Sequence, residues 1–156
     1  MVTLNYHRHR SGFTIVELLV VIVVIAILAA ITVVAFNGIQ ERARVTQAND
    51  DLALLNKAIR VARLSVDKNL YAITGSNCTR CFDQARYEQT LDLIGAASNT
   101  NLNALKAGDP WGAKYAIDEN EGEGATPCAN RDSLFLLTSG KTGINAQTIP
   151  FHACPN

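Results

Sequence analysis

The first 36 residues change abruptly from polar to apolar. Residues 1–12 (MVTLNYHRHRSG) are polar and basic, whereas residues 13–36 contain only three polar side chains, Thr14, Glu17 and Thr32. A helix of the second length measures about 36 Å, which exceeds a hydrocarbon core of about 30 Å. The pattern therefore predicts a short leader, 1–12, followed by a helical segment that can cross a membrane, 13–36.

The next segment, 37–68, has a one-sided pattern. Apolar residues recur at spacings of three and four, as on one face of a helix: Val45, Ala48, Leu52, Leu55, Ile59, Ala62 and Val66. The charged residues between them predict a solvated face: Arg42, Arg44, Asp50, Asp51, Lys57, Arg60, Arg63 and Asp67. Proline is absent before Pro110, and Gly38 alone costs only about 1 kcal/mol inside a helix. We therefore predict one helix from Phe13 to Lys68.

Residues 69–156 mix short apolar runs with turn-forming residues, as is typical of a small folded domain. One helix is predicted at Gln84–Ala97, with Leu91 and Ile94 facing inward. Three short runs bounded by Gly, Pro and Asn predict strands: Ala113–Asp118, Ser133–Ser139 and Thr148–Ala153. A three-stranded antiparallel sheet needs a covered face, and the apolar stripe of the long helix is the available cover. A self-contained coiled coil is the alternative use of that stripe, but it spans barely three heptads. The fold class is α+β, a long N-terminal helix on a small sheet head.

The distribution of charge predicts how the chain is oriented in a membrane and argues against a nucleic-acid partner. Lys and Arg total 14 and Asp and Glu total 14, with no basic face, so no specific nucleic-acid partner is predicted. Arg8 and Arg10 would keep the N-terminus in the cytoplasm and the head outside. An ordinary secretory signal peptide is the competing interpretation, but its apolar core is typically only about 7–15 residues. It predicts a mature chain that begins beyond Ala35.

Glu17 is the one charged residue of the apolar segment. A carboxylate inside a membrane helix costs about 2.5–3.5 kcal/mol on insertion scales, so it indicates a function. A cut before Phe13 would create an α-amine at that depth. In a staggered bundle, Glu17 of one copy could face the Phe13 amine of its neighbour, and this desolvated pair would fix the register. The alternative is that Glu17 lies near the membrane edge and extends to the headgroups.

The string SGFTIVELLVVIVVIAILAAI closely resembles the N-terminus of type IV prepilins and pseudopilins, and the resemblance covers residues 11–36. It implies that a prepilin peptidase cuts between Gly12 and Phe13 and N-methylates Phe13. It also implies that Glu17 neutralises the terminal amine of an adjacent subunit in a helical homopolymer. An assembly ATPase and an inner-membrane platform protein are the other implied partners. Many pilins have Gly and Pro where this chain has Ala26 and Val34, which leaves unwinding of the helix in a filament open.

A second resemblance lies in the head. Asp109-Pro-Trp-Gly-Ala-Lys-Tyr115 and Ser133-Leu-Phe-Leu-Leu-Thr-Ser-Gly140 are similar to features of major pseudopilins. Pro110 and Gly112 would set a tight turn, and Trp111 is expected to bury its ring under the sheet. Ligand stacking by this tryptophan is the alternative.

Four cysteines, Cys78, Cys81, Cys128 and Cys154, are an even count in a chain expected to leave the cytoplasm, which favours disulfides. We predict the pairs Cys78–Cys81 and Cys128–Cys154. The other two pairings stay open, as does a zinc site that would include His152.

The acidic segment between the first two predicted strands raises the possibility of a metal. Asp118, Glu119, Glu121 and Glu123 are candidate calcium ligands. The segment fails the EF-hand pattern because Ala129 occupies the position of the bidentate Glu, and a solvated acidic loop is the alternative. No Ser-His-Asp or Cys-His arrangement is evident, and His152 is expected at the surface or in a strand, so no enzyme is predicted.

These inferences predict a structural filament subunit. The membrane-anchored precursor would become part of an extracellular type IV pilus for adhesion, twitching motility or DNA uptake. A major pseudopilin of a type II secretion or competence system is the alternative. A membrane-anchored metal-binding module is a third interpretation, in which replacing Glu17 would leave function intact.

Overall fold

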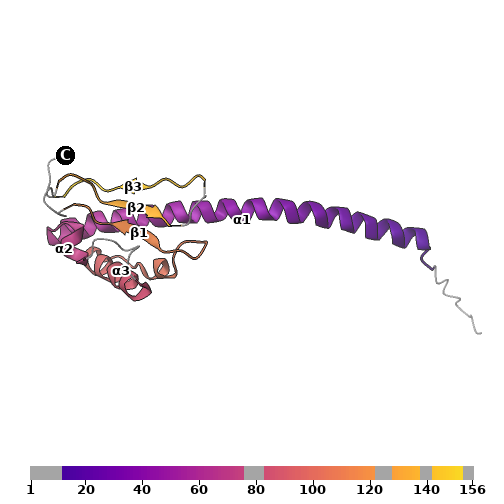
Figure 1. Ribbon diagram of the computed structural model, residues 1–156. Helices are drawn as coiled ribbons and strands as arrows, with labels where there is room; N and C mark the ends of the chain where they lie inside the picture. Colours follow the sequence, from indigo (N-terminus) through magenta and orange to yellow (C-terminus); the bar gives the residue numbers. More distant parts are fainter. Residues whose placement is uncertain (1–11, 76–82, 122–127, 138–141, 153–156) are drawn as a thin grey trace, which may run out of the picture. The chain divides into compact units, whose positions relative to one another are not determined.

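The computed structural model describes residues 12–75, 83–121, 128–137 and 142–152 (Figure 1). The chain divides into two compact units, Met1–Glu41 and Arg42–Asn156. Helix α1 (Ile15–Val66) contributes to both units. The predicted helix Phe13–Lys68 is therefore confirmed to within two residues at each end. Neither Gly38 nor its neighbours interrupt α1, as expected for a segment without proline.

The second unit, the head, is built on the predicted apolar stripe of α1. Ala48, Leu52, Leu55, Ile59 and Ala62 are all fully buried. Leu52, Leu55, Ile59 and Ala62 share one core with residues of the sheet, Tyr115, Ile117 and Leu134. The two ends of the stripe are less covered, since Val45 is half-buried and Val66 is exposed. Packing of the stripe on its own head is thus confirmed.

Two further helices close the core. The predicted second helix is confirmed as α3 (Gln84–Ser98), and its Leu91 and Ile94 are fully buried. Asp83 caps its start by accepting a hydrogen bond from the Arg86 backbone N–H at 2.9 Å. The sequence did not predict α2 (Leu70–Thr74) or the 3₁₀ helix η2 (Asn103–Ala107), which are short.

The sheet has three antiparallel strands in the order β1 (Tyr115–Asp118), β2 (Ser133–Leu136) and β3 (Gln147–Thr148). They lie beside the second part of α1 (Figure 1). β1 starts later than predicted because Ala113 belongs to a turn, in which its carbonyl accepts from the Asp109 N–H at 2.6 Å. The predicted strand ends at Ser139 and Ala153 lie outside the described residues.

The Asp109-Pro-Trp-Gly segment forms this turn. Asp109 Oδ1 accepts from the backbone N–H groups of Trp111 and Ala113, each at 2.9 Å. Gly108 has φ +87°, and a Cβ there would lie 2.4 Å from the Ala113 carbonyl oxygen. Trp111 is partly buried, so complete burial of its ring is not observed, and its packing under the sheet stays a prediction. The fully buried Tyr87 and Tyr115 supply the aromatic core.

Candidate functional site

The first turn of α1 is closed by a reciprocal set of hydrogen bonds. Glu17 Oε2 accepts from both the backbone N–H and the hydroxyl of Thr14, each at 2.8 Å. In return, the Glu17 N–H donates to Thr14 Oγ1 at 3.2 Å. This is a capping box, which satisfies amide groups that a helix start otherwise leaves unpaired. Thr14 followed three residues later by Glu17 is the sequence signal of a capping box, and it was not among the predictions above.

The other carboxylate oxygen of Glu17 has no donor in the described part of the chain. Both bonds from Thr14 end on Oε2, so Oε1 retains its acceptor capacity. Gly12 and Phe13 lie just before the first helical residue, and Phe13 is 80% exposed. The predicted cut site therefore lies four residues before Glu17, and the amine that it would create is expected to engage Glu17 of a neighbouring copy. The cut itself and the methylation of Phe13 stay predictions.

The apolar side chains of the first unit have no cover within the described chain. Among the large apolar residues from Phe13 to Val33, the least exposed is Val23 at 47%. The helix is long and apolar enough to cross a membrane, and its apolar part is not buried by any described residue. A contiguous apolar surface of this size marks contact with lipid or with other protein chains.

Known proteins with the same features place the chain in a family. Residues 7–33 match the prokaryotic N-terminal methylation motif. The type II secretion system core protein G of Escherichia coli is 32% identical over 136 residues, 86% of this chain and 83% of that protein. The chain belongs to the type IV pilin and pseudopilin family. The protein G of Aeromonas hydrophila is 39% identical over 67 residues, 43% of this chain and 46% of that protein.

A type IV fimbrial protein also matches the chain over a similar length. The type IV major fimbrial protein FimA of Dichelobacter nodosus is 29% identical over 144 residues, 90% of this chain and 82% of that protein. No solved structure matches the chain. A family of structural subunits points to a role other than catalysis. It also implies polymerisation of a membrane-anchored precursor that a prepilin peptidase processes.

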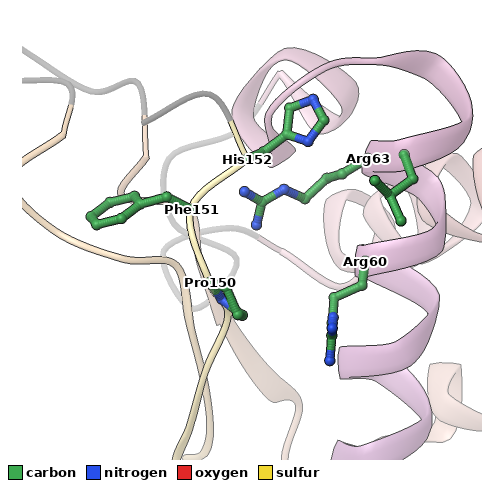
Figure 2. A pocket seen from close by; sticks show the side chains of 6 residues that line it. Arg60, Arg63, Pro150, Phe151 and His152 are labelled. Atoms are coloured by element: carbon green, nitrogen blue, oxygen red, sulfur yellow. The ribbon is translucent and has the colours of Figure 1, made fainter. Parts of the chain in front are cut away.

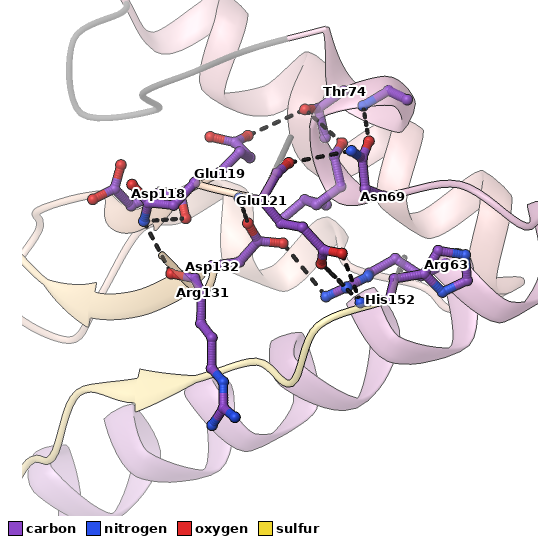
Figure 3. Close-up of polar contacts among 12 residues, drawn as sticks. Arg63, Asn69, Thr74, Asp118, Glu119, Glu121, Arg131, Asp132 and His152 are labelled. Atoms are coloured by element: carbon purple, nitrogen blue, oxygen red, sulfur yellow. Dashed lines mark hydrogen bonds and ion pairs between the residues drawn. The ribbon is translucent and has the colours of Figure 1, made fainter. Parts of the chain in front are cut away.

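The head of this pilin-family subunit contains a buried ion cluster (Figure 3). Arg63 pairs with Glu121, and its other guanidinium nitrogen lies 3.4 Å from Asp132 Oδ2. All three side chains are 3% exposed or less. Burial raises the pKa of Asp132 even though Arg63 acts in the opposite direction. The prediction of Arg63 on the solvated face is wrong, since it lies next to the buried Ala62 and reaches acids distant in sequence.

The cluster joins four segments of the chain. Glu121 accepts from the His152 backbone N–H at 2.8 Å, and its own N–H donates to Asp132 Oδ1 at 2.8 Å. Asn69, which caps α2, donates to the Glu121 carbonyl at 3.2 Å. The end of α1, the start of α2, the β1–β2 connection and the segment after β3 therefore meet here.

A solvated acidic loop was the alternative to a calcium site. The structure shows that part of this acidic segment is buried. Glu119 and Glu121 are 0% and 1% exposed, Asp118 is half-buried, and Glu123 lies outside the described residues. Thr74 donates to Glu119 Oε1 at 3.2 Å, whereas Oε2 has no partner in the described chain. Burial raises the pKa of Glu119 to about 8. Within the described ranges, no group of three metal-ligating side chains gathers. Calcium binding stays a prediction.

Besides Arg63, a second charged residue of α1 is less exposed than predicted. Asp51 was expected on the solvated face, but it is half-buried and accepts a hydrogen bond from the Tyr115 hydroxyl at 2.6 Å. Burial, and then this bond, raise the pKa of Tyr115 above its usual value. The bond links α1 directly to β1.

The remaining predicted site residues are only partly described. Cys128 takes part in a disulfide. Cys78, Cys81 and Cys154 lie outside the described residues, so the pairing stays a prediction. The His152 side chain is only 14% exposed, lies outside the strands and is 3.2 Å from the exposed Asp67.

Proposed function

We propose that this chain is the subunit of an extracellular type IV pilus, made as a single-pass precursor of the inner membrane with its head outside. The observation that carries the proposal is the exposed apolar part of α1, which begins two residues after Phe13 and contains Glu17 in its first turn. Lipid covers such a surface before assembly. Identical helices cover it afterwards, because packing among copies replaces lipid around the same apolar side chains.

In this proposal, cleavage after Gly12 supplies the charge that assembly needs. The new α-amine of Phe13 is largely protonated at neutral pH. Glu17 Oε1, which Thr14 leaves without a donor, can accept from the amine of a neighbouring copy. Inside a bundle of apolar helices this pair is stabilised by the low dielectric constant, and a misaligned copy would leave a charge buried alone. The pair therefore selects one register.

Mass spectrometry of the mature N-terminus tests the processing step. We expect a chain that begins at methylated Phe13. A chain that still begins at Met1, or one that begins beyond Ala35, would contradict the proposal.

The variant Glu17→Ala tests the assembly step. We expect normal cleavage but loss of sheared filaments, because the Phe13 amine loses its partner. Glu88→Ala on α3, which removes a carboxylate of the head, is the matched control and should assemble. Normal filaments from Glu17→Ala would favour a monomeric anchored module.

The second candidate function is the major pseudopilin of a type II secretion or competence system. The protein G relatives and the Asp109 turn favour it. Both functions use the same assembly chemistry, so imaging at native expression has to separate them. Long surface fibres support the pilus, and short fibres confined to the cell envelope support the pseudopilus.

A further inference from the structure

Two arginines of α1 follow the apolar segment at the point where the head begins. Arg42 and Arg44 come six and eight residues after Phe36, and both side chains are exposed. Neither side chain makes an ion pair or a hydrogen bond with a described residue. Glu41 beside them is half-buried and has its own interaction within the chain. In the described chain, the first turns of the head therefore present two cations without a counter-charge.

The neighbouring parts of the head bring no acid to this position. The loop 142–145 packs on the next turn of α1, where Asn49 donates to the Gly143 carbonyl at 3.0 Å, and this loop contains no charged residue. The next acid along α1 after Arg44 is Asp50, which comes about 9 Å later on a helix. Positive charge is therefore concentrated where the head follows the apolar segment.

The two arginines are spaced to reach the outer headgroup layer of a membrane. Residues 13–36 measure about 36 Å, against a hydrocarbon core of about 30 Å, so the end of this segment reaches the headgroups. Six residues from Phe36 to Arg42 add about 9 Å. Side chains on a helix lean toward its N-terminus, which here is toward the membrane, and a long arginine extends its guanidinium in that direction. Both guanidinium groups can therefore meet lipid phosphates.

Cleavage after Gly12 would change the charges that hold the helix in the membrane. The basic leader, 1–12, favours a cytoplasmic N-terminus, but it is removed by the cut. On the inner side, the mature chain would keep the Phe13 amine and Glu17, whose charges cancel. Arg42 and Arg44 are then the basic residues nearest to the apolar segment. Basic residues at the outer end oppose the usual preference for the inner side, which indicates a function of their own.

We propose that Arg42 and Arg44 bind the phosphate groups of an anionic phospholipid, such as phosphatidylglycerol, in the outer leaflet. A guanidinium pairs with a phosphate through two parallel hydrogen bonds, and each basic residue near an anionic surface strengthens the attachment. After cleavage, this contact replaces the leader as the electrostatic attachment of the subunit, and it breaks when the subunit leaves the membrane. The leaflet rests on the proposed function, whereas the lipid contact needs only a membrane-anchored chain.

A lipid titration of the complete chain tests this contact. Every sample carries Arg8→Gln/Arg10→Gln, so that the leader does not bind the lipid, and this chain is the parent. Native mass spectrometry in a neutral detergent measures the Kd of the first phosphatidylglycerol bound. We expect Arg42→Gln or Arg44→Gln to weaken binding about fivefold and both together about 25-fold, since a basic residue near the surface contributes about 1 kcal/mol. Zwitterionic phosphatidylcholine should bind the parent more weakly than phosphatidylglycerol does.

Two cations farther along α1 provide the matched control. Lys57 and Arg60 are exposed and make no ion pair with a described residue, and Arg60 lines a hollow of about 150 Å³ beside the segment Pro150 to His152 (Figure 2). Lys57 comes about 22 Å after Arg42 on the helix, so Lys57→Gln/Arg60→Gln should leave the Kd unchanged. Arg42→Lys/Arg44→Lys keeps both charges and should retain most of the affinity.

Three outcomes would overturn the proposal. The first is an equal Kd for phosphatidylglycerol in the parent and in Arg42→Gln/Arg44→Gln. The second is an equal loss in Lys57→Gln/Arg60→Gln, which would indicate attraction to the overall charge of the head. The third is displacement of the lipid by millimolar inorganic phosphate, which would indicate a general anion site. A parent chain that binds the lipid while the unchanged chain forms no filaments would contradict the proposed function and leave the lipid contact in place.

Discussion

The two units of the chain share helix α1 but support it in opposite ways. In the unit Met1–Glu41, the apolar side chains face outward and the described residues offer them no cover. In the unit Arg42–Asn156, the apolar stripe is buried under α3 and the sheet, and the chain supplies its own core. The apolar side chains of the first unit thus need lipid or other protein chains around them, whereas those of the second unit are buried within the unit itself.

Their acids differ in the same way. Glu17 keeps one oxygen without a donor from the described chain, so its remaining partner has to come from another molecule. Glu121 is occupied from several sides by Arg63 and by backbone N–H groups. A family whose members first reside in lipid and then polymerise needs this difference between the two units of one chain.

The strongest way to break this comparison is to remove the first unit. We expect residues 42–156, exported alone to an oxidising compartment, to form a soluble, cooperatively unfolding domain. The complete precursor should need detergent to remain in solution, because its exposed apolar segment is retained. Size-exclusion chromatography and thermal unfolding followed by circular dichroism measure both. If the head is unfolded without the first unit, it does not supply its own core, and the contrast between the two units is wrong.

The next largest effect should come from the ion cluster of the head. Arg63→Met leaves Glu121 and Asp132 buried without their cation, which should lower the free energy of unfolding by about 3–5 kcal/mol. Arg60→Met, one turn earlier on α1, is the matched control, because Arg60 is exposed and makes no pair in the described chain. We expect its effect to stay within about 0.5 kcal/mol. Denaturant unfolding of the head measures both, and equal effects would show that the cluster adds no stability.

The elements that the sequence predicted well are those determined by local periodicity. α1 and α3 follow from apolar spacing, and the buried stripe follows from the same spacing. The capping box at Thr14 and Glu17 was equally local and could have been predicted. These features depend on residues within a few positions of one another.

The features that the sequence did not predict depend on distant contacts. Arg63 has the spacing of a position at the edge of the stripe, yet its burial requires Glu121 and Asp132, which lie 58 and 69 residues away. Acids and arginines are rarely fully buried without such partners, so a lone charged residue was reasonably predicted at the surface.

A smaller effect should distinguish the acids within the head. Burial raises the pKa of Glu119 from 4.5 to about 8. Between these values the folded head holds a proton that the unfolded chain has released, so the free energy of unfolding should fall as the pH rises through this window. Glu119→Gln, which cannot ionise, should remove about 3–4 kcal/mol of this fall between pH 5 and pH 8, given that one pKa unit corresponds to about 1.4 kcal/mol.

Denaturant unfolding at pH 5, 6.5 and 8 measures that slope. Asp132, whose pKa burial also raises, remains in the variant, so part of the slope should persist. Glu88→Gln makes the same chemical change on α3 and controls for the loss of a carboxylate. If Glu119→Gln and the unchanged head lose stability in parallel from pH 5 to pH 8, then Glu119 is ionised in the folded head. It would then need a cation at its second oxygen, and the contrast between a self-sufficient head and a dependent first unit would no longer hold at this position.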